Sequence, residues 1–166
     1  MPGRVDQAWA ASVNAAFPVA SYGQDHSHGG MYVSTAVETV ISVQSTPTKA
    51  LGTTTALRLQ DFEMSANNRL KYVAQATSHF VVTVALSMTA AGNNQLTTLS
   101  VAKNGTNIPS TEIQRFISTG ADLGAAAVAT IVELEQDDYL ELFVANETGT
   151  GNLTVELMNF VVSEVG

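Results

Sequence analysis

Apolar and polar residues alternate in short runs over most of the chain, from about residue 36 to residue 166. The alternation is clearest at residues 80–88, where Phe80, Val82, Val84, Leu86 and Met88 would face one side and the residues between them the other. Period-two runs separated by turn residues are typical of half-buried strands. We predict strands at residues 37–44, 55–64, 69–75, 79–90, 95–103, 111–118, 125–135, 138–146 and 152–165.

The turns between these runs are rich in Asn, Gly and Asp, at residues 91–94, 103–105, 136–138 and 149–152. Asn and Gly tolerate the positive φ that tight hairpins need. No helical pattern separates the strands, which excludes a parallel α/β fold. The sequence therefore predicts an all-β, antiparallel two-sheet jelly-roll sandwich over residues 36–166.

The last predicted strand changes phase. Leu153, Val155 and Leu157 would face one side, whereas Met158, Phe160 and Val162 follow with the opposite parity. A β-bulge inserts one residue and reverses the parity of the positions after it. We therefore expect a bulge near Leu157–Met158.

The first 35 residues have a different pattern and are predicted to form an N-terminal arm. Val5, Trp9, Val13 and Phe17 recur every four residues and end at Pro18, which predicts a short helix over residues 5–17 with one apolar face. Residues 21–35 are rich in Gly and Ser and predict an extended loop. The helix could pack on its own domain or dock on a neighbouring molecule.

Composition points to an assembled, acidic protein. Hydrophobic residues make up 45% of the chain and charged residues 13%, which is little charge for a free surface and favours an oligomer. The net charge of −8 argues against nucleic acid as a partner. No apolar run has the length of a membrane span, and the start lacks a signal-peptide pattern, so we expect synthesis in a cytoplasm and no membrane partner.

Residues 69–165 resemble the jelly roll of the complement globular head and tumour-necrosis-factor superfamily. The resemblance rests on HFVVTVALSM, on a strand entering Lys-Asn-Gly-Thr, on VATIVELEQDDYLELFV and on a strand that ends the chain. The segments GGMYVS, NNRLKYVAQAT, SMTAAGNNQ, VAKNGT and VANETGTGNLTVE resemble small bacteriophage structural proteins that carry this jelly roll.

The resemblance implies a homotrimer, and strand parity selects residues for its interface. If Leu140, Leu142 and Val144 face the core, their neighbours on the strand face outward. An outward apolar patch in a chain with little charge needs a cover. The predicted trimer interface consists of Tyr139, Glu141, Phe143, Met158 and Phe160.

The sequence contains no pattern typical of an enzyme site, and we expect a non-enzymatic protein without a cofactor. The adjacent carboxylates Asp137 and Asp138 would diverge on a hairpin turn rather than act as an acid and a base. His26 and His28 would project to the same side of an extended arm, and around a three-fold axis they would offer six imidazoles to one metal ion. The alternative is an arm that contains histidines without a metal, because no third ligand type is near.

These observations predict a virion structural protein, a capsid decoration (cement) protein that forms trimers on the outer surface of a phage head. Its partners would be the major capsid protein or neighbouring decoration trimers, contacted through Val5, Trp9, Val13 and Phe17 of the arm. The alternative is a receptor-binding or tail-fibre head domain. A carbohydrate-active enzyme or lectin is disfavoured, because the chain has one Trp and no paired carboxylates of the required kind.

Overall fold

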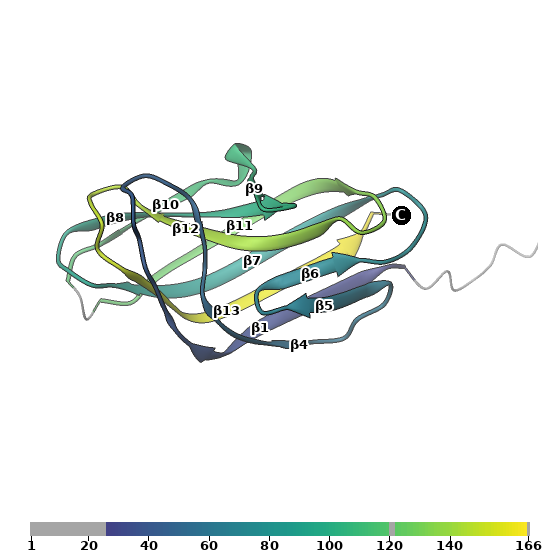
Figure 1. The fold of residues 1–166 in the computed structure, drawn as a ribbon, viewed down its shortest axis with the longest axis horizontal. Coiled ribbons are helices and arrows are strands. Elements are labelled where there is room, and N and C mark those ends of the chain that lie inside the picture. The colour runs from purple at the N-terminus through teal and green to yellow at the C-terminus, as the bar shows by residue number, and fades with distance from the viewer. Residues whose placement is uncertain (1–25, 120–121, 166) are drawn as a thin grey trace, which may run out of the picture.

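The computed structural model describes residues 26–119 and 122–165, and almost all of their regular structure is strand (Figure 1). One turn of 3-10 helix, η1 (Pro109–Thr111), lies between two strands. The strands are β1 (His28–Ala36), β2 (Glu38–Thr39), β3 (Thr48–Lys49), β4 (Gly52–Ala56), β5 (Phe62–Ala66), β6 (Arg69–Tyr72), β7 (Ser78–Ala90), β8 (Gln95–Lys103), β9 (Thr106–Asn107), β10 (Ile113–Ile117), β11 (Gly124–Leu134), β12 (Tyr139–Asn146) and β13 (Leu153–Glu164).

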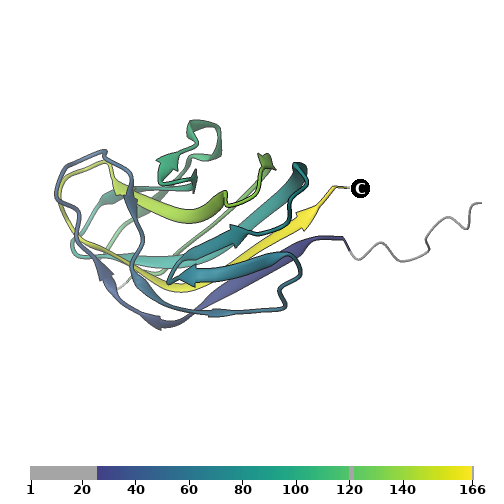
Figure 2. The same cartoon turned by 45° about the vertical axis from the view of Figure 1, so that its right-hand side comes forward.

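The strands form two antiparallel sheets that pack face to face (Figure 2). The first, which we call sheet A, has the order β11-β7-β13-β1-β4, with β2 beside β13. The second, sheet B, has the order β10-β8-β12-β6-β5, with β3 beside β12 and β9 beside β8. This arrangement confirms the predicted all-β jelly-roll sandwich.

The core lies between the two sheets and is filled by alternate residues of each strand. Phe80 and Phe160 of sheet A and Leu99 and Leu142 of sheet B are fully buried. At one end of the core, the rings of Phe62, Tyr72 and Phe80 pack with centroids 5.0–5.3 Å apart. Edge-to-face contacts at this spacing are favourable for aromatic side chains.

The first described strand begins inside the segment predicted as an arm. β1 pairs with β13 on one side and with β4 on the other, so residues 28–35 belong to the jelly roll and not to the arm. Gly29 permits this close packing, since a Cβ there would lie 2.9 Å from the Phe62 side chain. The Gly-rich sequence that predicted a loop is instead a strand that passes close to a bulky neighbour.

The segment between β1 and β6 also differs from the prediction. Residues 37–44 were expected to form one strand, but only β2 pairs there, and the Ile41 amide donates to Asn152 Oδ1 outside any strand. The strand predicted at 55–64 is divided into β4 and β5. Short irregular elements of this kind depend on distant partners, which local alternation does not reveal.

The later turns and the bulge agree with the sequence. Asn94, Asn104 and Asp137 have positive φ angles of 55°, 54° and 72° in three of the predicted turns. The register of β13 against β7 shifts between Val155 and Leu157, close to the expected bulge. As a result Met158, which follows the shift, returns to the core, while Leu157 faces outward.

Candidate assembly surfaces

The outer face of sheet A is uncharged over most of its area. Its outward positions are Ala125, Ala127, Ala129 and Ile131 on β11, Val81, Thr83, Ala85 and Ser87 on β7, Leu157, Asn159, Val161 and Ser163 on β13, and Gly30 and Tyr32 on β1. We call this set the sheet A face. Within the described residues, the Asp, Glu, His, Lys and Arg side chains on these strands lie only toward the ends of the face.

Large apolar side chains are exposed on the sheet A face. Ile131 and Leu157 are 62% and 64% exposed, and Tyr32, Val81 and Val161 are each about 40% exposed. Scattered exposed aliphatic residues are normal on a monomer, but these five occupy one face without charges between them. The face therefore has the character of a protein contact surface.

The sheet A face is hollowed beside the bulge in β13. A depression of about 370 Å³ is lined by Tyr32, Ala85, Ser87, Leu157 and Asn159, among others. The buried Ser87 hydroxyl has no hydrogen-bond partner among the described residues. The bulge turns Leu157 outward at the rim of this depression, so the face offers both a projecting side chain and a hollow.

The two margins of the sheet A face carry groups of opposite charge, the Glu133 carboxylate on one and the Arg58 guanidinium on the other. On the β11 margin, Glu133 lies 3.4 Å from His79 Nε2. The opposite margin is formed by β1 and by the segment after β4 that lies beside it, and we call it the β1 margin. There, a second hollow of about 220 Å³ is lined by His28 and Arg58 together with Leu57, Val161 and Ser163. His28 Nδ1 lies 2.8 Å from the carbonyl oxygen of His26, which leaves Nε2 free of that contact.

The predicted trimer interface requires a correction. Phe160 is fully buried and Met158 is 5% exposed, because the bulge places both in the core of their own chain. Side chains without exposed surface cannot contact a neighbouring subunit. The alternation correctly indicated that Met158 and Phe160 share one side of β13. That side faces the core and not the outside.

The other three predicted interface residues lie on the outer face of sheet B. Tyr139 and Phe143 are half-buried there, as expected from the burial of Leu140, Leu142 and Val144. Glu141, however, is only 1% exposed. The β12 face is therefore already partly covered by its own chain.

Two cations cover Glu141. Its Oε1 accepts hydrogen bonds from Lys49 Nζ at 2.7 Å and from Arg69 Nε at 2.8 Å. The Arg69 guanidinium also lies 4.0 Å above the centre of the Tyr139 ring. A buried carboxylate needs such partners, because an unpaired one would be strongly destabilising. This cluster is a structural clamp between β12, β3 and β6.

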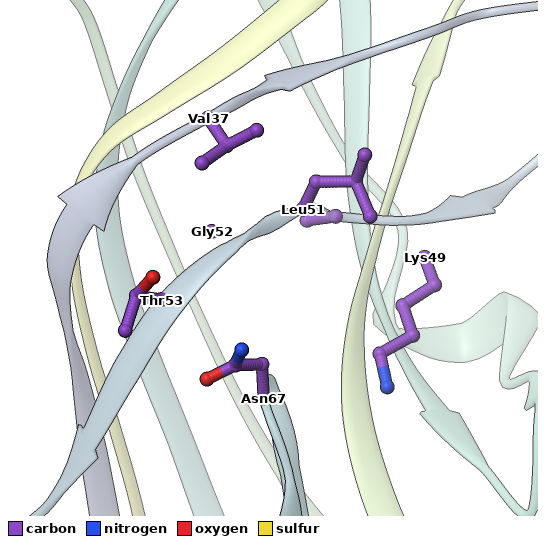
Figure 3. A pocket seen from close by; sticks show the side chains of 7 residues that line it. Val37, Lys49, Leu51, Gly52, Thr53 and Asn67 are labelled. Carbon is purple, nitrogen blue, oxygen red and sulfur yellow. The ribbon is translucent and has the colours of Figure 1, made fainter.

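The groove near this clamp, shown in Figure 3, is lined by Val37, Leu51, Asn67 and Lys49, among others. Its volume is about 250 Å³. The cation at its rim is already engaged, because Lys49 binds Glu141, and Asn67 Oδ1 accepts from the Thr54 amide.

The structure also places His26, one of the two predicted metal ligands, and the adjacent carboxylates Asp137 and Asp138. No group of three or more His, Asp or Glu side chains in the described residues is arranged to hold a metal ion, and His26 lies 4.0 Å from Glu164 instead. Asp137 and Asp138 diverge, to Lys71 and Lys103 respectively, both at 2.7 Å. Burial opposes ionisation of Asp138, but hydrogen bonds from Asn104 and Lys103 outweigh it and lower its pKa.

The apolar arm residues Val5, Trp9, Val13 and Phe17 lie outside the described residues. In the described part of the chain, no helix has the length and apolar character needed to cross a membrane.

The sheet A face was missed by sequence reasoning, although its signal was present. The alternating strand at 80–88 has Val81, Thr83, Ala85 and Ser87 as its second face, and none of these residues is charged.

Comparison with known proteins supports the fold. No family model matches the chain, and no curated protein matches its sequence significantly. Among solved structures, the Eiger TNF of S. frugiperda superposes with a TM-score of 0.53 at 10% identity, over 85% of this chain and 93% of that one. Murine APRIL superposes with a TM-score of 0.47 at 12% identity, over 81% of this chain and 98% of that one. The superposition on the Eiger TNF, together with the two antiparallel sheets, shows a tumour-necrosis-factor-like jelly roll.

Proposed function

We propose that the protein is a non-enzymatic virion structural protein, a capsid decoration protein that forms homotrimers on the outer surface of a phage head and stabilises the shell. The observation that carries this proposal is the sheet A face, which is uncharged and exposes Ile131 and Leu157. An extended apolar face of this kind is expected to be covered by another protein. In the proposed trimer, the sheet A face of each copy packs against its neighbours.

The resemblance of GGMYVS, NNRLKYVAQAT and VANETGTGNLTVE to phage structural proteins supports the choice of particle. In this proposal, residues 1–20 attach the trimer to the major capsid protein or to neighbouring trimers. Three arms bind with avidity, so weak single contacts are sufficient when they engage together. The net charge of −8 per chain disfavours adhesion to released nucleic acid.

Two measurements test the proposal. Light scattering of the purified protein should give the mass of three chains, and a monomer at all concentrations would refute the assembly. Gold-labelled protein should then bind to isolated heads of the phage that carries the gene, and a form without residues 1–20 should remain trimeric but bind heads much more weakly. Undiminished binding by the truncated form would remove the arm from the mechanism. Label found only at the tail tip would replace the proposal with a receptor-binding role.

A further inference from the structure

Arg58 stands out among the cations of this acidic chain. Of the lysines and arginines that the structure describes, Lys49, Arg69, Lys71 and Lys103 each pair with a carboxylate. Arg58 and Arg115 are both exposed and make no ion pair in the described residues, although acidic residues outnumber basic ones by fifteen to seven. Arg115 lies on β10 of sheet B, whereas Arg58 lies beside sheet A. An arginine without a carboxylate in such a chain is available to bind an anion from outside.

The surroundings of Arg58 fit a carboxylate on an aliphatic stem. Arg58 and His28 line the hollow at the β1 margin of the sheet A face, and Leu57 and Val161 supply apolar walls. The planar guanidinium can hold a carboxylate with two parallel hydrogen bonds. The apolar walls can contact the methylene groups that carry the carboxylate.

A matching carboxylate lies on the opposite margin of the same face. Glu133 on β11 has a side chain that is 54% exposed, and its contact within the described chain is with His79. The strand order β11-β7-β13-β1-β4 places Glu133 and Arg58 at the two sides of sheet A. One chain thus presents a carboxylate on one margin and a guanidinium on the other.

The two groups also lie toward the same end of the strands, although not in one row. His28 pairs with Ser163, Ser163 with Val81, and Val81 with Ile131, so these residues form one row across the sheet. Glu133 is the next outward position after Ile131 on β11, about 7 Å along the strand. Arg58 follows Leu57, whose amide bonds to Gly30 in the row on the other side, so Arg58 and Glu133 are offset by about three residues, or roughly 10 Å, along the strands.

A closed ring brings these margins together. Four strands of the sheet A face offer roughly 500 Å², from strand spacings of about 4.8 Å and about eight residues at about 3.4 Å each. A stable contact usually buries about 800 Å² on each partner, so the margins must contribute as well. In a three-fold ring whose axis runs along the strands, the β1 margin of one copy meets the β11 margin of the next.

We infer that Arg58 of one copy binds Glu133 of the neighbouring copy, and that this pair fixes the closure of the ring. This inference rests on the proposed trimer and names the contact that orients it. Charge pairs at such margins select the correct partner orientation and suppress incorrect ones.

Charge reversal tests the pair. Sedimentation velocity at low and at high salt would measure the dissociation of wild type, Arg58→Glu, Glu133→Arg and the double variant. Each single reversal should weaken the trimer about tenfold at low salt, and the double variant should return to within about threefold of wild type. The control is Arg115→Glu, which makes the same charge change as Arg58→Glu at an exposed arginine without an ion pair on β10 of sheet B and should leave the trimer unchanged.

The possible outcomes separate the two proposals. A monomeric wild type would refute the proposed trimer itself. A trimeric wild type whose single variants are unaffected would overturn only the Arg58–Glu133 pair. Weakening by Arg58→Glu without recovery in the double variant would also overturn it, because the carboxylate would then come from another residue.

Discussion

Asn68 is a single buried side chain that replaces missing backbone pairing in sheet B. Its Nδ2 donates to the carbonyl oxygens of Ala50 and Leu142, at 2.9 and 2.8 Å, and its Oδ1 accepts from the Leu142 amide at 2.9 Å. Its own amide donates to Thr54 Oγ1. The residue is 3% exposed and has a φ of 51°, a conformation that Asn adopts more readily than most residues.

Replacing Asn68 by alanine should therefore be costly. The change removes three side-chain hydrogen bonds, leaves buried backbone groups of Leu142 and Ala50 unpaired, and keeps the unfavourable φ. We expect a loss of about 3 kcal/mol in the free energy of unfolding, measured by chemical denaturation. The matched control is Asn67→Ala, next to it but exposed, which should cost at most about 1 kcal/mol. Equal losses for the two variants would contradict this role of Asn68.

The role of Asn68 illustrates what can be predicted from sequence at this scale. Asn94 and Asn104 were identified as turn residues because positive φ in a hairpin is a local property. Asn68 was not singled out, since its partner Leu142 is distant in the chain. Glu141 was predicted to face outward and does so, but its burial depends on Lys49 and Arg69, which come from other strands.

At the scale of elements, Glu164 joins the ends of three strands. Its Oε1 accepts from Ser78 Oγ at 2.7 Å at the start of β7, and its Oε2 accepts from the Ser27 amide at 2.9 Å just before β1. Glu164 itself ends β13. The hydrogen bonds from Ser78 and Ser27 lower the pKa of the Glu164 carboxyl. The carboxylate thereby holds the beginning of β1 against its two neighbours.

The lowered pKa gives a dependence of stability on pH. Because the folded state holds the Glu164 proton more weakly than the unfolded state, the contribution is fully present above the ordinary glutamate range, near pH 4.3. It declines as the pH falls from there and is lost below the folded-state pKa. Glu164→Gln should lower the unfolding temperature at neutral pH, and the difference from wild type should shrink in acid.

Thermal unfolding followed by circular dichroism between neutral and acidic pH measures this difference. Glu135→Gln is the control, because the exposed Glu135 carboxylate makes no hydrogen bond or ion pair in the described residues, and it should match wild type at every pH. A constant difference between Glu164→Gln and wild type across the whole range would show that Glu164 does not act through its charge.

The elements themselves were predicted with uneven success. From residue 69 onward the predicted strands match β6 to β8 and β10 to β13 closely, because most of these strands are long, alternate clearly and are bounded by turns rich in Asn, Gly or Asp. β1 was missed, since Gly29 and Gly30 indicate a loop until the packing of Phe62 and Leu57 against them is known. Residues 37–66 were misassigned because their strands are short and irregular: β2 and β3 have two residues each, and the pairing of β4 with β1 and of β5 with β6 contains register shifts.

At the scale of the whole molecule, the two outer faces of the sandwich differ in how far the chain itself covers their apolar side chains. The alternation of residues in the sequence does not show this difference. The face with Tyr139 and Phe143 was predicted as the interface because these residues form an outward apolar patch and because the family resemblance places that face at the three-fold axis. The structure shows that this face is partly covered by Lys49 and Arg69 of its own chain, whereas the sheet A face is open. Which apolar surface is already covered is a tertiary property.

The last prediction compares the two faces directly. Thr83 lies near the centre of the sheet A face, between Ala129 and Val161, and is exposed. Thr83→Glu should leave the monomer folded, because the side chain projects from the sheet, but should dissociate the trimer by bringing like charges into a poorly solvated contact. Phe143→Asp on sheet B should remain trimeric. Light scattering measures the mass of each variant, and circular dichroism confirms that it is folded. A trimeric Thr83→Glu together with a monomeric, folded Phe143→Asp would transfer the interface to the outer face of sheet B.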